Sequence, residues 1–337
     1  MTSDIPGIPA PPFDPELAAA LAVADFPATL TADMISTFRE RAATTDLMIE
    51  EVLNNVERRD HVIPGHEGAE ITVSVLSRPG RTAPGPGIYA IHGGGMIMGD
   101  RFTTIDTVLP WVFEHDAVVV TVEYRLAPEF PDPYPVEDCF AGLKWTFENA
   151  ADLGIDVQRL IIAGGSAGGG LAAGTTLLAR DRQLPPLFGQ VLQCPMLDDR
   201  NETVSSLQID GIGTWERGSN LLGWTSLLGD RQGSDNVSIY AAPGRATDLA
   251  GLAPTFIDCG SAEVFRDECV AYASRIWEAG GAAELHIWAG GLHGFEAFAP
   301  HAAISQAATA ARNNWVSRLL DNESRGKTRA VHEVAEA

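Results

Sequence analysis

From residue 71 to residue 320, short apolar runs alternate with longer segments of helical periodicity. The runs are rich in Val and Ile and are bounded by Gly or Pro, which is typical of buried strands. Because strands that alternate with helices pair in parallel beneath those helices, this order predicts an α/β fold with a mostly parallel sheet flanked by helices. The expected strands are residues 71–78, 87–95, 117–125, 159–166, 190–195, 254–260 and 283–290, and the expected helices are 136–150, 169–182, 267–280 and 305–320.

Two long segments lie outside this alternation. Residues 16–57 follow a proline-rich start and space Leu, Ala, Met and Ile to form one apolar helical face. Residues 197–250 carry Trp215 and Trp224 but no clear strand, and an insertion of this size between two strands predicts a cap over a site. The expected division is N-terminal cap helices at 1–57, an α/β core at 58–196 and 251–321, a cap insertion at 197–250 and a flexible polar tail at 322–337.

The charge of the chain argues against two classes of partner. Its 45 acidic residues outnumber 23 basic ones, which gives a formal net charge of -22. Nucleic acids and anionic membrane surfaces are held by Lys and Arg, so we expect neither as a partner. The N-terminus has no basic segment before its short apolar run, and no run is long enough to span a bilayer, so we expect neither a secretory signal nor a membrane span.

Cysteine usage points to a reducing compartment. Cys139, Cys194, Cys259 and Cys269 match no metal-ligand spacing and no catalytic cysteine motif. We therefore expect reduced, buried thiols in a cytoplasmic protein, with no metal and no cofactor.

A serine lies between glycines where a strand gives way to a helix, in Gly164-Gly165-Ser166-Ala167-Gly168. This is the context that a nucleophile elbow requires, because the strained turn and its tight packing need glycine around the serine. The turn holds the hydroxyl at the N-terminus of the next helix, whose dipole favours developing negative charge. Alone, the pattern also fits a glycine-rich turn with a capping serine.

A second glycine motif supports the catalytic interpretation of Ser166. His92-Gly93-Gly94-Gly95 closes an upstream strand. Acyl transfer needs backbone N–H groups that already point at the developing oxyanion, and glycines let the chain approach a substrate closely. We expect the N–H groups of Gly93, Gly94 and Ala167 to form this oxyanion hole, and His92 to have a structural role.

The expected general base is His293. It lies in a glycine-rich loop directly after the last predicted strand, from which a ring can reach a serine at the carboxyl edge of the sheet. Of the eight histidines, only this one combines nearby glycines, a position after a strand and the chain order serine, acid, histidine.

Several acids compete for the third position, which holds the imidazole in the correct tautomer. Glu263 follows a predicted strand at its exit and is the favoured candidate. Asp198 also follows a strand, whereas Asp267 fits the first turn of the next helix. Asp258 lies within a strand and is expected to point elsewhere.

Together these motifs resemble the bacterial hormone-sensitive-lipase-like esterases (family IV), a branch of the α/β-hydrolase superfamily. The resemblance covers about residues 60–320 and rests on HGGG (92–95), YRLAPE (124–129), GGSAGG (164–169), EVFRDE (263–268) and HGF (293–295). It implies the α/β-hydrolase fold with a helical cap, a Ser166, Glu263 and His293 triad, and oxyanion donors at Gly93, Gly94 and Ala167. Two positions depart from the commoner family pattern, since Gly165 and Glu263 each stand where Asp is more usual.

The resemblance also implies an activity. We expect a carboxylesterase, a serine hydrolase that cleaves small-molecule esters with short acyl chains through an acyl-enzyme. Trp215, Met96 and Met98 are expected to line the substrate pocket. The alternatives on this fold are a non-hydrolytic ligand-binding protein and a lyase. Strand 283–290 is expected at a sheet edge, where related esterases often pair, and this predicts a homodimer.

Overall fold

Eight strands form one sheet within the part of the chain that the computed structural model describes, which is residues 8–24, 27–43, 51 and 53–335. Their spatial order is β1-β2-β4-β3-β5-β6-β7-β8, and every pair from β4 to β8 is parallel. The mostly parallel sheet is thus confirmed. The strands are β1 (Glu57–Pro64), β2 (Glu70–Ser77), β3 (Gly85–Ile91), β4 (Val118–Glu123), β5 (Ile155–Gly165), β6 (Gly189–Gln193), β7 (Thr255–Gly260) and β8 (Ala283–Trp288).

The first two strands run antiparallel to their neighbours. Strand β1 was not predicted, because its sequence ERRDHVIP has no apolar run. Most of its residues are exposed, and Ile63 is the buried one. Pairing with β2 along eight residues, rather than burial of side chains, therefore makes this segment a strand.

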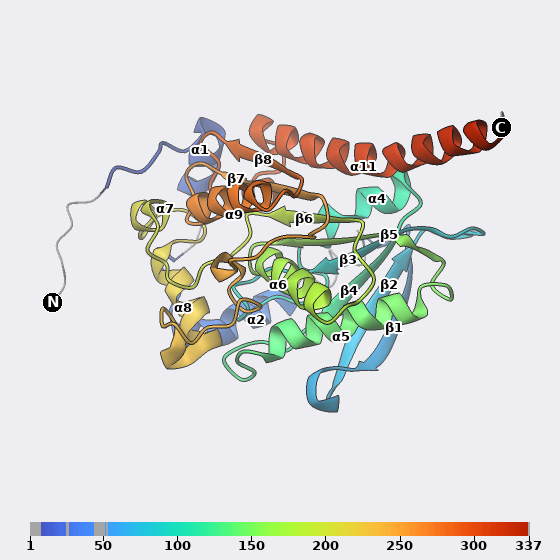
Figure 1. The fold of residues 1–337 in the computed structure, drawn as a ribbon. Helices are drawn as coiled ribbons and strands as arrows, with labels where there is room; N and C mark the ends of the chain where they lie inside the picture. The colour runs from blue at the N-terminus through green and yellow to red at the C-terminus, as the bar shows by residue number, and fades with distance from the viewer. Residues whose placement is uncertain (1–7, 25–26, 44–50, 52, 336–337) are drawn as a thin grey trace.

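Helices cover both faces of the sheet (Figure 1). One face packs on α5 (Tyr134–Asn149), α6 (Ala167–Asp181) and α9 (Arg266–Glu278), and the other on α4 (Leu109–Glu114) and the C-terminal α11 (Ala303–Ala335). Alternate residues of β3 divide between the two cores: Tyr89 and Ile91 join the first, whereas Ile88 and Ala90 join the second. The sequence predicted each of these helices except α4.

The N-terminal segment differs from the single helical face expected over 16–57. It contains α1 (Pro15–Val23), the 3₁₀ turn η1 (Ala32–Met34) and α2 (Ile35–Ala43), and residues 25–26, 44–50 and 52 lie outside the described part. Helix α1 packs on the other end of the chain, because Leu17 is fully buried against Leu292 and Phe295. Tertiary contact thus divides a stretch whose composition favours helix throughout.

The insertion at 197–250 forms helices and turns: α7 (Val204–Gln208), α8 (Arg217–Leu228), η4 (Gly229–Arg231) and η5 (Pro243–Arg245). Its apolar residues divide, with Trp224, Leu227 and Leu228 buried in the main core and Leu221 exposed. The remaining short elements are the turns η2 (His66–Gly68) and η3 (Ile105–Thr107) and helix α10 (Phe295–Phe298). At the C-terminus α11 continues to Ala335, across the segment expected to be a flexible tail.

All four cysteines are buried and free. Among the described residues, none of the helices combines the length and the apolar character needed to cross a bilayer.

Candidate active site

Ser166 occupies the sharp turn between β5 and α6. Its φ of 57° and ψ of -124° lie in a region that non-glycine residues rarely adopt, so the surrounding structure must hold it there. The N–H of Ser166 donates to the carbonyl of Gln193 at 2.8 Å, and its own carbonyl accepts from Met196. A side chain at Gly164 would place its Cβ 2.2 Å from the carbonyl oxygen of Gly168, so this close approach requires glycine. The turn presents the hydroxyl at the carboxyl edge of the sheet.

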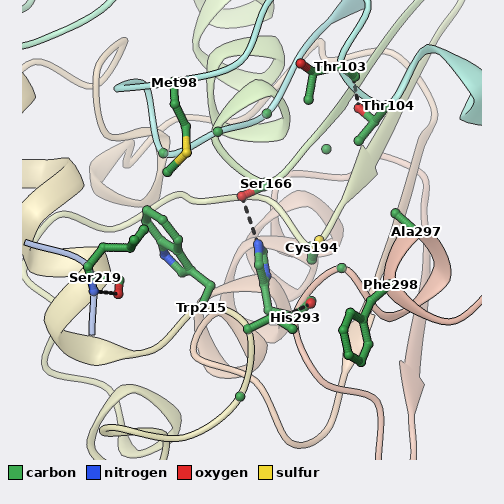
Figure 2. Close-up of a pocket in the computed structure, with 18 of the residues that line it drawn as sticks. Met98, Thr103, Thr104, Ser166, Cys194, Trp215, Ser219, His293, Ala297 and Phe298 are labelled. Atoms are coloured by element: carbon green, nitrogen blue, oxygen red, sulfur yellow. Dashed lines mark hydrogen bonds between the residues drawn. The ribbon is translucent and has the colours of Figure 1, made fainter. Parts of the chain in front are cut away.

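His293 reaches Ser166 from the loop that follows β8. Its Nε2 lies 2.9 Å from Ser166 Oγ (Figure 2). Two distant segments hold the loop: the N–H of Asp14 donates to Gly290 at 2.9 Å, and the hydroxyl of Thr214 donates to the His293 carbonyl at 2.5 Å. The N-terminal segment and the insertion thus both fix the position of the histidine. Sequence reasoning missed this use of Thr214, because no local pattern indicates a contact across 79 residues.

Glu263 completes a chain of hydrogen bonds. Its Oε2 lies 3.0 Å from Nδ1 of His293, and its side chain is fully buried just beyond β7. Burial raises the pKa of the Glu263 carboxyl, and the hydrogen bond with His293 opposes that rise. A carboxylate here fixes the imidazole with its proton on Nδ1 and leaves the Nε2 lone pair facing Ser166.

The competing acids lie elsewhere. Asp198 forms a bidentate ion pair with Arg200. Asp267 accepts a hydrogen bond from the backbone of Ser205 at 2.8 Å. The Asp258 carboxylate faces Trp288 and Arg312. None of the three is hydrogen-bonded to His293 in the described structure, so Glu263 is the acid that the fold brings to this ring.

The expected oxyanion donors lie close to the elbow, since Gly93 and Gly94 line the cavity with Ser166 and Ala167 begins helix α6 directly after it. Gly93 packs on the elbow, since a Cβ on it would lie 2.9 Å from the Gly165 carbonyl oxygen and 3.4 Å from Ser166 Cβ. Gly94 has a φ of 111°, and a Cβ there would lie 2.1 Å from the Met98 carbonyl oxygen, so only glycine fits. Among the described residues, no acceptor takes the N–H hydrogens of Gly93, Gly94 or Ala167. The arrangement leaves three donors available to an oxyanion.

His92 is buried, and its ring contacts the glycine loop and Tyr124. Its Nδ1 is 2.7 Å from the Gly93 carbonyl oxygen, and its ring stacks on Tyr124 with centroids 4.1 Å apart. Burial lowers the pKa of His92, which favours the neutral ring. These contacts match the structural role expected for it.

A cavity of about 580 Å³ opens over Ser166 and His293. Met98 and Trp215 line it, as expected, and Figure 2 shows them on one side of the serine with Phe298 and Ala297 on the other. The expectation for Met96 was wrong, because the turn after Gly94 directs this side chain into the main core, where it is fully buried. Further wall residues come from the N-terminal segment and from the loop before α4: Pro27, Ala28, Leu30, Phe38, Thr103, Thr104 and Thr107.

A buried charge cluster that the sequence did not predict lies beside the cavity. Arg312 of α11 is 1% exposed and its Nη2 lies 2.7 Å from Glu296, which lines the cavity wall. The same guanidinium lies 3.6 Å from Asp258. Burial raises the pKa of Glu296 to about 7, and the attraction of Arg312 opposes that rise. The cluster ties α11 to the segment that follows His293.

Comparisons with known proteins agree with this geometry. A family model described as alpha/beta hydrolase fold matches residues 88–297. Carboxylesterase NlhH of Mycobacterium tuberculosis is 34% identical over 304 residues, which cover 87% of this chain and 92% of the relative. Esterase LipI of the same species is 34% identical over 245 residues, which cover 70% and 73% of the two chains.

Solved structures show the same similarity. A bacterial heroin esterase superposes with a TM-score of 0.83 at 38% identity, over 91% of this chain and 98% of the other. Esterase LipW from Mycobacterium marinum gives a TM-score of 0.82 at 33% identity, over 92% and 98% of the two chains. The chain therefore belongs to the α/β-hydrolase fold family, within its hormone-sensitive-lipase-like esterases.

Proposed function

We propose that this carboxylesterase cleaves short-chain esters with Ser166 as nucleophile, His293 as general base and Glu263 as the orienting acid. One observation carries the proposal: a continuous hydrogen-bond chain, 2.9 Å and 3.0 Å long in its two links, runs from Ser166 through His293, which both line the cavity, to the buried Glu263 behind them. A hydroxyl next to a neutral imidazole whose far nitrogen faces a carboxylate is activated for attack on an acyl carbon.

The reaction proceeds in two halves. Ser166 Oγ attacks the ester carbonyl while His293 Nε2 takes its proton, and the collapsing intermediate expels the alcohol, which receives that proton from His293. Water then attacks the acyl-enzyme, with His293 again as base, and releases the carboxylic acid. In each half the oxyanion accepts hydrogen bonds from Gly93, Gly94 and Ala167. Each such donor is worth on the order of 10²–10³ in kcat.

The cap that we propose has two parts, the N-terminal helices of 1–57 and the insertion at 197–250. Leu30 and Phe38 from the first part and Thr214 and Trp215 from the second line the cavity, which supports this division. Walls of this kind exclude water and limit the length of the acyl chain. A cavity of about 580 Å³ lies within the range of small-molecule pockets. We therefore propose an optimum at acyl chains of about two to six carbons.

A hydrolysis assay with a matched serine variant tests the nucleophile. Ser166→Ala should lose nearly all hydrolysis of p-nitrophenyl acetate with an unchanged circular dichroism spectrum. Ser274→Ala is the control, because that hydroxyl lies on α9 and donates to the carbonyl of Val270 in the same helix. A folded Ser166→Ala protein that retains activity contradicts the assignment, and wild-type protein that binds esters without turnover favours a ligand-binding function.

The acyl-length proposal needs its own panel. Values of kcat/KM for acetate, butyrate, octanoate and palmitate esters should peak at one of the two shortest. A maximum at palmitate, or a rise in rate above the micelle threshold, would show that the cavity does not limit chain length.

A further inference from the structure

A cysteine that the proposed mechanism does not use lies beside the histidine. Cys194 follows β6, lines the active-site cavity and is 8% exposed (Figure 2). Its Sγ, a carboxylate oxygen of Glu263 and a ring nitrogen of His293 all lie within 4.8 Å of one another. These three atoms belong to the side-chain types that bind zinc in proteins.

The spacing of the three atoms is close to that of a coordination shell. Zinc binds thiolate sulfur at about 2.3 Å and imidazole nitrogen or carboxylate oxygen at about 2.0–2.2 Å. Two ligands of one ion are therefore separated by at most about 4.4 Å and, in a tetrahedral shell, by about 3.5 Å. Side-chain shifts of about 1 Å or less bring all three atoms within range. Cys194 and His293 line the cavity, from which water can reach an ion that they hold.

We propose that Cys194, Glu263 and His293 form an inhibitory site for Zn²⁺ and other thiophilic divalent cations. Binding releases the thiol proton of Cys194 to solvent, because the thiolate is the ligand form. The net charge of -22 raises the local concentration of cations around the protein. No spacing in the sequence indicates this site, since its ligands come from the ends of three different strands.

The ion should inhibit the enzyme whether it binds Nε2 or Nδ1 of His293. This part of the inference rests on the proposed role of His293 as the general base. An ion on Nε2 occupies the lone pair that accepts the proton of Ser166. An ion on Nδ1 displaces the Nδ1 proton, so the neutral ring carries its proton on Nε2 and cannot accept another. Both modes remove the base and leave the oxyanion donors unaffected.

A second group of potential ligands makes the assignment testable. Cys259 and Cys269 also lie within 4.8 Å of Glu263, but they are 2% and 0% exposed and face the core. An ion from solvent reaches Cys194 through the cavity, whereas the other two thiols are enclosed. The site that we propose therefore depends on Cys194 and is independent of Cys269.

The experiment measures binding and inhibition separately. Wild-type protein, Cys194→Ser and Cys194→Ala are compared with two matched controls, Cys139→Ser in helix α5 and Cys269→Ser. The concentration of free Zn²⁺ that halves the activity is expressed relative to each variant's own uninhibited rate. Co²⁺ titration, read as a thiolate-to-cobalt charge-transfer band, and Zn²⁺ equilibrium dialysis report binding without any need for activity, including in Ser166→Ala.

We expect one equivalent of Co²⁺ with a thiolate band in wild type and in both controls, and inhibition that a chelator reverses. Substitution of Cys194 should abolish the band and raise the half-inhibitory Zn²⁺ concentration at least about tenfold. A wild-type protein without the band, or loss of the band in Cys269→Ser but not in the Cys194 variants, overturns the site. Binding without inhibition overturns the inhibitory role of the site and, because that role rests on His293, also counts against His293 as the base.

Discussion

Replacing Glu263 by glutamine tests the least expected member of the proposed triad. The substitution preserves the length and volume of a side chain that is fully buried, so the packing around it should survive. Its amide, however, has a nitrogen that can donate to Nδ1 of His293 across the present 3.0 Å contact. Such a bond favours the tautomer with the proton on Nε2, which cannot accept from Ser166.

The expected loss is large. Removing the charge of a triad acid while keeping its shape lowers kcat by on the order of 10⁴, which corresponds to about 5 kcal/mol of transition-state stabilisation. Glu263→Asp keeps the charge but withdraws the carboxylate by one methylene, so the 3.0 Å contact lengthens unless the loop moves. We expect this variant to lose about 10–100-fold, because a carboxylate near the ring still stabilises the imidazolium.

The assay is kcat for p-nitrophenyl butyrate, with circular dichroism to verify folding. Asp198→Ala is the matched control, since Asp198 follows a strand in the same way but pairs with Arg200. Its kcat should stay within about tenfold of wild type. The reasoning is refuted if folded Glu263→Gln keeps more than a tenth of the activity, or if Asp198→Ala loses more than Glu263→Gln.

Four further outcomes are expected. Gly94→Ala forces a Cβ to within 2.1 Å of the Met98 carbonyl oxygen, so the loop must move. The shift should displace the Gly94 N–H from the oxyanion and lower kcat by on the order of 10². A variant as active and as stable as wild type would contradict the role of Gly94 in the oxyanion hole. Trp215→Ala enlarges the cavity, which should let two more methylene groups of an octanoyl chain be buried. Their burial is worth about 1.6 kcal/mol, so kcat/KM for octanoate relative to butyrate should rise about tenfold. An unchanged ratio would show that the acyl chain does not lie against Trp215. Burial raises the pKa of Glu296 from 4.5 to about 7, so the unfolded chain releases this proton first as pH rises through that window. The free energy of unfolding should therefore fall by at most about 3 kcal/mol as the pH rises from 4.5 to about 7, and by less in Glu296→Gln. Urea unfolding curves measured at these two pH values test this. Strand β8 ends the sheet, so light scattering at micromolar concentration should give the mass of a homodimer, and a monomer mass would refute pairing there.

The sequence by itself determined the layered α/β architecture and predicted two site residues, Ser166 and His293, that the fold brings within 2.9 Å of each other. Runs of Val and Ile that match the length of a strand, separated by amphipathic helices, leave few arrangements other than a covered parallel sheet. The glycines around Ser166 and after His92 mark places where the backbone comes too close to its neighbours for a Cβ, and such requirements are visible in local sequence.

Only the tertiary structure decided features that depend on contacts between distant segments. The charged β1 is a strand because β2 pairs with it, and the 16–57 segment divides because Leu17 packs on Leu292. The position of β4 between β2 and β3 likewise has no local signal.

The same distinction holds within the site. Sequence favoured Glu263 for the third position but left Asp198 and Asp267 as alternatives, and only the structure shows which of these carboxylates lies 3.0 Å from His293. Met96 and Met98 are two residues apart, yet the turn sends one into the core and the other to the cavity. Local patterns encode backbone periodicity and special dihedral angles, whereas the meeting of side chains from separate strands is set by the packing of the whole sheet.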